Sequence, residues 1–298
     1  MRALVFFCFL AFGCAAYGAE GTGRAGHGHI SLTYQYIAVD GFTTGSRTAE
    51  IGTTDTHGLN FHLDYAVTDR WTVGIGVPLI TKRWNGPSSS AHRPDLIDPP
   101  QDQEFIDDGE YHTEWQDLHL TASYAAKTDG PLTIEPFMAA GIPTHDYPHF
   151  AHAAVGQNLW RFEAGARIFY QPHFSRFYYG FHPRYVFVEE TLDTSVDHWL
   201  IDAEIGYFFN SSVSVRTFLI HKDGDGVTST AADFPDRTSP RWFQHDRMLI
   251  HNFTNLGVGV DWQVSPKYRL SFSAMTQVDG EWVHIMDYTG TFTVSRSF

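Results

Sequence analysis

The sequence predicts an all-β fold, a transmembrane antiparallel β-barrel of about twelve strands, and three observations lead to this prediction. Short segments in which apolar and polar residues alternate recur along most of the chain, and successive side chains of a strand point to opposite faces. The chain begins with a segment typical of secretory signal peptides. Its last strand ends on an aromatic residue, Phe298, as the final strand of a bacterial outer-membrane barrel does.

The N-terminal segment has a basic residue, Arg2, followed by an apolar run from Ala3 to Phe12 and then by small residues. The apolar run is too short to cross a bilayer as a helix. We therefore expect residues 1–19 to be a signal peptide and residues 20–298 to form one outer-membrane barrel domain.

Cysteine usage and charge restrict the chemistry of the mature chain. Cys8 and Cys14 both lie in the signal segment, so disulfides and thiolate catalysis are not expected. A lipoprotein site at Cys14 is the alternative. Gly13 before this cysteine suits such a site, but Ala11 and Phe12 do not. The net charge of −14 makes nucleic acid an unsuitable partner.

Twelve segments alternate with the period of a strand. The apolar face carries Leu, Ile, Val, Ala, Tyr, Phe and Trp. The opposite face carries mainly Ser, Thr, Gln, Asn, His, Asp and Gly in the first four segments, includes Glu and Arg in the middle four, and carries mainly Ser, Thr, Asn, Gln, Arg and Asp in the last four. In chain order they are Ile30–Tyr36, Leu59–Val67, Trp71–Leu79, Leu118–Tyr124, Leu132–Ile142, Trp160–Tyr170, Phe177–Phe187, Trp199–Tyr207, Val213–Leu219, Leu256–Val264, Tyr268–Ala274 and Phe292–Phe298.

Connections of two lengths alternate between these strands, as expected for short periplasmic turns and long external loops. The longer ones are Asp40–Thr54, Lys82–His112, Pro143–Gly156, Val188–His198, His221–Asp246 and Gln277–Gly290. The last strand is expected to close onto Ile30–Tyr36. The soluble alternative, a β-sandwich or lipocalin-like barrel, would have to pack all the aromatic residues of the apolar face into one interior.

The polar face of the strands should line the lumen, because basic charges on the lipid face are costly near the bilayer midplane. The predicted lumen-lining charges are Asp64, Asp117, Glu135, Arg161, Glu163, Arg167, Arg184, Asp202, Glu204, Arg216, Asp261 and Arg269. Mixed charges around a pore create a transverse field that selects small polar solutes. Alternatively, these charges pair and fill a narrow barrel.

Arg296 is an exception, because it has the same parity as Val294 and Phe298 on the apolar face. We expect it at the periplasmic rim, where its guanidinium can reach water.

Three external segments carry side chains that bind metals. His145, Asp146, His149 and His152 form a candidate zinc or copper site, although a solvated loop is the simpler interpretation. The long loop contains acidic residues that suit Ca²⁺ or are merely solvated: Asp95, Asp98, Asp102, Glu104, Asp107, Asp108 and Glu110. The run Asp223–Gly226 begins like a calcium loop but lacks the later Glu.

We expect no enzymatic activity and no cofactor. Twelve-stranded barrels include outer-membrane lipid hydrolases, whose chemistry needs a Ser close to a His. The nearest approach is the run His251–Asn255, which contains no Ser, and no G-x-S-x-G motif occurs.

Several segments resemble the family named for the MetA pathway of phenol degradation, a group of outer-membrane transporters. They are Thr68–Trp71 with Gly74–Pro78, Asp117-Leu118, Gly141–Thr144 with Asp146-Tyr147, and Asn255–Gly259. His145 stands where family members often have Gly, and Gly permits backbone angles that His does not.

The resemblance implies a channel for aromatic or other small hydrophobic compounds. We therefore expect a monomeric channel or uptake protein that works by passive diffusion, with outer-membrane lipid and a small-molecule solute as its partners. The alternatives are a non-conducting surface barrel that binds ligand or metal through its external loops, and an outer-membrane lipid hydrolase.

Overall fold

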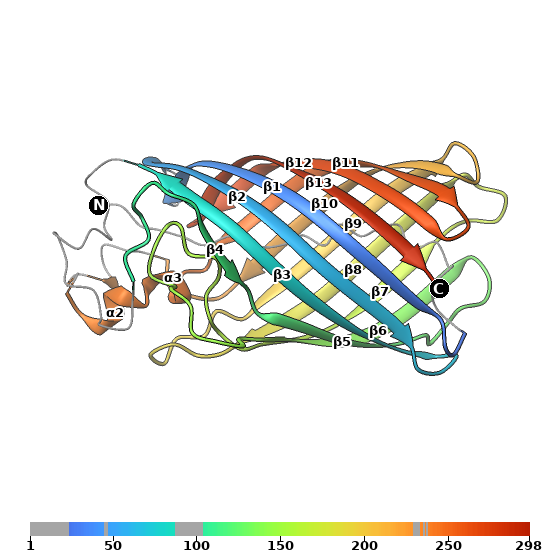
Figure 1. Cartoon of the computed structure of the whole chain (residues 1–298), viewed down its shortest axis with the longest axis horizontal. Coiled ribbons are helices and arrows are strands. Elements are labelled where there is room, and N and C mark those ends of the chain that lie inside the picture. The colour runs from blue at the N-terminus through green and yellow to red at the C-terminus, as the bar shows by residue number, and fades with distance from the viewer. Residues whose placement is uncertain (1–23, 45–46, 87–103, 229–232, 235, 237) are drawn as a thin grey trace.

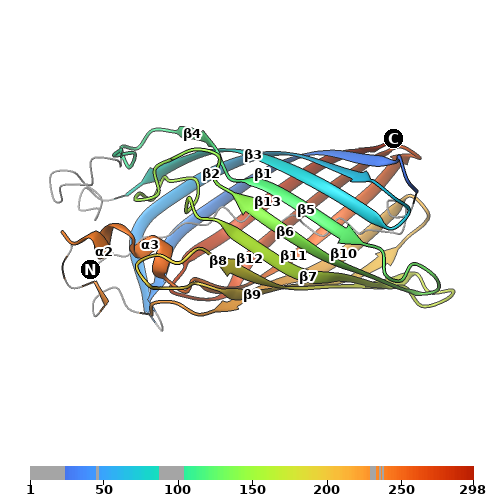
Figure 2. The ribbon, with the colours of Figure 1, turned by 90° about the horizontal axis from the view of Figure 1, so that it is seen from below.

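The chain forms a single closed barrel, seen from two sides in Figures 1 and 2. In this computed structural model the described residues are all except 1–23, 45–46, 87–103, 229–232, 235 and 237. The predicted signal peptide therefore lies outside the described residues. No helix in the described part of the chain is long and apolar enough to cross a membrane.

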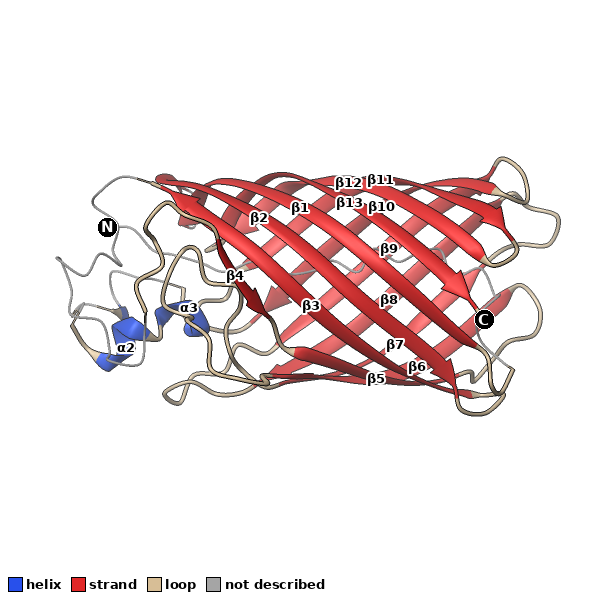
Figure 3. Ribbon diagram, in the orientation of Figure 1, coloured by secondary structure: helices blue, strands red, loops and turns tan. Residues whose placement is uncertain are grey.

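The barrel is antiparallel and consists of strands that cross it obliquely (Figure 3). The strands are β1 (Gly28–Thr44), β2 (Arg47–Ala66), β3 (Trp71–Asn85), β4 (His112–Trp115), β5 (Leu118–Tyr124), β6 (Leu132–Ile142), β7 (Arg161–Tyr170), β8 (Phe177–Val188), β9 (His198–Phe208), β10 (Val213–Gly224), β11 (Asn252–Ser265), β12 (Tyr268–Glu281) and β13 (His284–Ser297). Each pairs with its neighbours in chain order. Because β4 and β5 both pair with β3, they share one position, and the barrel has the predicted twelve.

The break between β4 and β5 is a β-bulge opposite a proline. Leu79 of β3 is opposite Trp115, whereas Gly76 is opposite His119, so β4–β5 contains one extra residue. The carbonyl of Pro78 accepts a hydrogen bond from the backbone N–H of Gln116 at 2.9 Å. A bulge changes the direction of neighbouring side chains, and here Gln116 and its neighbour are both buried.

The barrel closes between β1 and β13, as predicted. His29 is opposite Ser297, and the pairing continues to Phe42 and His284. At the end of this pairing, Gly28 of β1 and Phe298, which follows β13, exchange two backbone hydrogen bonds of 2.9 Å each. The sheet thus closes on itself, which is the condition for a sheet to cross a bilayer.

Two aromatic belts surround the outer surface. One lies beside the tight turns and includes Trp71, Tyr124, Tyr170, Tyr179, Phe177, Tyr207, Trp262 and Tyr268. The other includes Trp115, Trp160, Tyr185, Phe187, Trp199 and Tyr288. Along β8, Phe177 and Phe187 are ten residues apart. With a rise of about 3.3 Å per residue and a tilt of about 40°, the belts are roughly 25 Å apart, the height of the apolar band of an outer-membrane barrel.

Arg296 lies at the end of the barrel that carries the tight turns, the turn end. Its guanidinium carbon is 5.7 Å from the ring centroid of Tyr268 in the neighbouring strand. The charge therefore sits on an aromatic face beside the rim, where it can reach water.

The opposite end, here called the loop end, differs from the prediction. Asp40–Thr54 and Gln277–Gly290 were expected to be loops, but most of these residues extend the strands of two hairpins, β1–β2 and β12–β13. Above the lipid band the polar side chains face outward and apolar ones such as Phe42 and Ile51 face inward. The alternation that marks a lipid-facing strand is thus reversed there, and a bulge at Gly41 (φ 85°) interrupts it.

Candidate functional site, the barrel lumen

All twelve predicted lumen charges face the interior, and each lies within 4 Å of an oppositely charged or protonatable side chain. The contacts at 3.5 Å or less join Arg161 to Asp117, Arg167 to Glu135, Arg184 to Glu163 and Asp202, Arg216 to Glu204 and Asp261, and His62 to Asp64; Arg269 is 3.9 Å from Asp261. These pairs run along the barrel wall, and most of them join adjacent strands, so of the two alternatives the pairing of charges is what the structure contains.

The centre of this network is Arg216, which is buried between two acidic residues. Its Nη1 donates to Asp261, and its Nε lies 3.5 Å from Glu204. Asp261 also accepts a hydrogen bond of 2.5 Å from the Ser271 hydroxyl. Glycines on the same face make room for these groups: the position of a Cβ on Gly259 lies 3.0 Å from Cζ of Arg216. Buried charges of both signs thus hold neighbouring strands together.

An apolar band lies inside the barrel between the charge network and the loop end. Its members share the lumen-facing parity: Val186, Val188, Leu200, Phe218, Ile220, Phe253 and Met275, with Leu159, Val196 and Val283 beside them. Sequence reasoning missed this band, because it searched the polar parity only for charges. Phe218 and Ile220, between Arg216 and Lys222 on β10, were the available signal.

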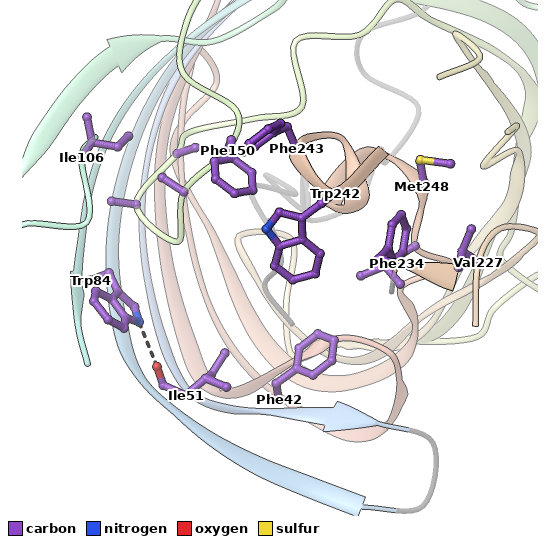
Figure 4. Close-up of a cluster of buried hydrophobic side chains, with 14 residues drawn as sticks. Phe42, Ile51, Trp84, Ile106, Phe150, Val227, Phe234, Trp242, Phe243 and Met248 are labelled. Carbon is purple, nitrogen blue, oxygen red and sulfur yellow. Dashed lines mark hydrogen bonds between the residues drawn. The ribbon is translucent and has the colours of Figure 1, made fainter. Parts of the chain in front are cut away.

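Two external segments fold into the loop end. We call them the plug, which consists of residues 147–159 and the described residues of 225–251. They contribute most of a buried cluster that also includes Phe42, Ile51 and Trp84 of the barrel wall (Figure 4). The second segment carries α2 (Pro240–Phe243) and α3 (His245–Met248). Trp242 is 1% exposed. A plug was one of the features that the sequence could not decide.

The start of α2 is fixed by local sequence. The Ser239 hydroxyl accepts from the backbone N–H of Trp242, and Pro240 occupies the first helical position. This cap directs Trp242 into the cluster, where its ring stacks on His245 with centroids 4.1 Å apart.

Hydrogen bonds to the backbone join the plug to the barrel wall and to the segment that precedes β4. Asp107 accepts from the backbone N–H groups of His152 and Ala153, at 3.0 and 2.9 Å. Lys82 donates to the carbonyl of Ala154 at 3.1 Å, and Gln116 donates to that of Val155 at 2.8 Å.

The two plug segments are also joined to each other. Arg247 donates to the carbonyls of Gln157 and Asn158, at 2.7 and 2.9 Å. Gln157 returns a bond of 2.9 Å to the carbonyl of Asp246. A loop with so many backbone carbonyls bound by side chains is a folded element and not a solvated tip.

The four residues of the candidate metal site lie in different surroundings. His145 is exposed and 3.4 Å from Glu114, and Asp146 is also exposed. His149 and His152 are buried in the plug, where His152 stacks on Trp84 with centroids 4.4 Å apart. Within the described residues, no three His, Cys, Asp or Glu side chains are grouped so as to hold a metal ion.

The acidic loop and the Asp223 run have other structural contacts. Asp95, Asp98 and Asp102 lie outside the described residues. Asp108 contacts His112 at 2.9 Å, which holds the pKa of Asp108 below its usual range together with the backbone N–H of Glu110, although burial opposes the shift. Asp223 accepts from the side chain of Asn252 at 3.2 Å.

Solved structures of outer-membrane proteins share this architecture. The COG4313 outer membrane channel from Pseudomonas putida F1 matches with a TM-score of 0.71 at 15% identity, covering 94% of this chain and 98% of that one. The translocator domain of the autotransporter NalP from Neisseria meningitidis matches with a TM-score of 0.51 at 10% identity, covering 93% and 89%. No family model and no curated protein matches the sequence. At these identities the likeness establishes the fold. Together with the lipid-facing apolar surface between the two aromatic belts, the fold places the chain in a bacterial outer membrane as a twelve-stranded β-barrel.

Proposed function

We propose that the protein is a monomeric outer-membrane channel that admits small molecules by passive diffusion and is closed in this state by its plug. The observation that carries the proposal is the contrast between wall and plug. The wall is a closed barrel with a lumen lined by charged side chains. The obstruction at the loop end is made of connecting segments, which can move without breaking the barrel.

Two further features support an uptake role. The loop end carries the long connections, which face outward in outer-membrane barrels, so the plug would control entry from outside. The resemblance to the transporters of the MetA pathway suggests aromatic or other small hydrophobic compounds as solutes. The apolar band below the plug offers such compounds a surface.

The experiment is a comparison of conductance in planar bilayers. The wild-type protein is compared with a variant in which residues 228–248 are replaced by a short Gly-Ser linker; Val227 and Leu249 are paired by an isolated bridge, so a short linker spans the gap. We expect low conductance in the wild type and a large increase in the variant. A folded variant that conducts neither ions nor phenol would contradict the channel.

The plug also favours a second candidate, a non-conducting surface protein that binds ligand through its loops, because the plug contributes most of a buried hydrophobic cluster. Titration calorimetry with zinc, copper and calcium tests the metal form of this function. The lipid-hydrolase alternative loses its candidate base, because His251 is buried inside the loop end and does not face lipid.

A further inference from the structure

A groove runs across the outer surface of the barrel, on the wall formed by β1 and β8–β13. Its volume is about 920 Å³. Side chains of the outward parity line it, among them Val258 at 62% exposed and Ile205 at 50% exposed. Because these side chains lie between the two aromatic belts, the groove, here called the outer groove, opens to the hydrocarbon of the bilayer.

The register of the strands forms the floor of the outer groove. One row of short side chains crosses successive strands, each residue opposite the next: Thr217, Val258, Ala274 and Gly290. A Cβ on Gly290 would meet nothing within 4 Å, so the space above this backbone is open. The neighbouring row contains Phe272 and Phe292, whose rings stack with centroids 4.7 Å apart. Short side chains beside aromatic rings thus produce a groove that follows the direction of the interstrand hydrogen bonds.

The outer groove crosses the membrane band obliquely, from one aromatic belt to the other. Phe177 and Tyr207, which are opposite each other, line it at the turn-end belt. Tyr36 lines its other end, and the ring centroid of Tyr36 is 5.9 Å from that of Tyr288 in the loop-end belt. From β8 to β1 there are six strand spacings of about 4.8 Å, which make the groove roughly 29 Å long. This length exceeds the depth of one leaflet, about half of a hydrocarbon core of about 30 Å.

The shape and position of the outer groove favour a lipid chain as its occupant. In the bilayer only hydrocarbon reaches a surface between the aromatic belts, and an unfilled groove would lose dispersion contacts along its lining. A flexible acyl chain can follow a shallow groove along its length. The convex wall of a second barrel would instead leave most of the groove empty.

The two ends of the outer groove differ in charge. At the turn end, Arg176 is exposed immediately before β8, and its Nη1 donates to the carbonyl of Phe209 at 3.4 Å. A guanidinium has further N–H groups, which suit a phosphate. At the loop end, the Tyr36 hydroxyl donates to the carboxylate of Asp55 at 2.7 Å, and Arg83 is paired with the same carboxylate at 2.7 Å. A phosphate is therefore favoured at the turn end.

We propose that the outer groove binds one acyl chain of a phospholipid from the leaflet at the turn end, with the phosphate of that lipid at Arg176. The tight turns of outer-membrane barrels face the periplasm, and the periplasmic leaflet consists of phospholipid. The bound chain covers Ala274 and Gly290. This inference rests on the membrane location of the barrel and not on the proposed channel function.

Native mass spectrometry of the purified protein, incubated with dipalmitoyl phosphatidylglycerol in mild detergent, tests the site. We expect the wild type to retain one lipid. Ala274→Phe fills the floor and should reduce the retained fraction about tenfold, the loss expected when a few methylene groups leave an apolar contact. Gly290→Leu fills the next floor position and should act in the same way. Ala203→Phe is the matched control, because Ala203 has the outward parity on β9 but does not line the groove, and this variant should retain the lipid.

Further variants and a second lipid test the position of the phosphate. Arg176→Gln should weaken lipid retention, whereas Arg176→Lys, which keeps the charge, should preserve most of it. Incubation with lipid A distinguishes the leaflets, because preferential retention of lipid A would overturn the assignment to the turn end. A wild type that retains no lipid, a lipid-free dimer, or an Ala274→Phe variant that retains as much lipid as Ala203→Phe overturns the proposal.

Conductance recorded on the same samples keeps this inference distinct from the channel function. Lipid retention by a protein that does not conduct would refute the channel and leave the outer groove as a lipid site. Conductance by a protein that retains no lipid would do the reverse.

Discussion

The ring of Phe298 lies against the backbone of Gly28, at the point where the two ends of the barrel sheet meet. A Cβ on Gly28 would overlap the ring, while the same two residues exchange both of their backbone hydrogen bonds. The terminal aromatic residue is therefore part of the closure of the barrel as well as of its aromatic rim. Only glycine leaves enough room for it.

Substituting Gly28 should thus weaken barrel closure. We expect Gly28→Val to lower the free energy of unfolding by about 1–3 kcal/mol, the usual cost of forcing extra volume into a packed site. The free energy of unfolding is measured by urea titration in detergent, with the heat-modifiable migration of the barrel on a gel as the readout of the folded fraction. Gly290→Ala is the control, because a Cβ there meets nothing within 4 Å. Equal stability of both variants would show that the ring simply moves aside.

Removing Trp242 should open the plug without unfolding the barrel. Truncation of a buried Trp to Ala costs about 3–5 kcal/mol, and here the loss falls on the plug cluster, which is separate from the strand pairing. We expect Trp242→Ala to raise single-channel conductance toward that of the plug-replacement variant.

The control for this variant is Trp160→Ala, which removes a tryptophan that is 55% exposed on the lipid-facing surface. It should leave the conductance at the wild-type level. If Trp242→Ala also stays at that level, α2 does not hold the channel closed.

The parts of the fold that face lipid could be predicted from the sequence, and the plug could not. Where a strand crosses the bilayer, its two faces meet hydrocarbon and the charged lumen, so period-2 alternation identifies segments such as Phe177–Phe187. Above the bilayer the outside is water, and the pattern of Phe42 and Ile51 resembles that of a polar loop. The plug depends on contacts between segments far apart in sequence, such as Asp107 with His152, which no local pattern reveals.

The candidate site likewise has one part that could be predicted from the sequence and another that could not. Parity alone assigns Arg216 and Asp261 to one face, but their pairing depends on the register between β10 and β11, in which Arg216 is opposite Gly259. His251 was considered from the sequence only as part of a catalytic site, whereas the structure buries it inside the loop end. This burial is a tertiary property that no local pattern reveals.

The lumen ion pairs should stabilise the barrel only while both charges of a pair are present, so removal of one partner should cost more stability than removal of both. Arg216→Met leaves Glu204 and Asp261 buried without their cation, and we expect a loss of about 3–5 kcal/mol in the free energy of unfolding. Neutralising the acids as well, in the triple variant with Glu204→Gln and Asp261→Asn, should recover most of it. Equilibrium urea unfolding followed by tryptophan fluorescence measures both. Arg70→Met, at an exposed arginine of the turn end, should change stability by less than about 1 kcal/mol. A triple variant as unstable as Arg216→Met would contradict charge pairing as the cause.

The plug should loosen as the pH falls below about 6.5. Burial, assisted by the nearby Arg247, lowers the pKa of His149 to about 3, and burial also lowers the pKa of His251. Both rings are neutral in the closed plug but bind protons in an opened one. Their contribution to the stability of the closed plug is therefore complete above the ordinary pKa of 6.5 and declines as the pH falls toward the lowered pKa values.

Asp246 opposes this trend with a single proton. Burial raises its pKa well above the usual range, so the closed plug takes up that proton as the pH falls. Because two histidines act against one carboxyl, the free energy that favours the closed plug falls by about 1.4 kcal/mol at most for each pH unit between about pH 6.5 and pH 4.

We therefore expect conductance to rise between pH 7 and pH 5, and the rise to be shallower in His149→Gln, which has no titrating ring. Bilayer recordings at fixed salt across this range measure it. His173→Gln, at an exposed turn-end histidine, should retain the wild-type slope. A conductance that is flat in the wild type, or one that falls with acidification, would show that the buried histidines do not couple to the opening of the plug.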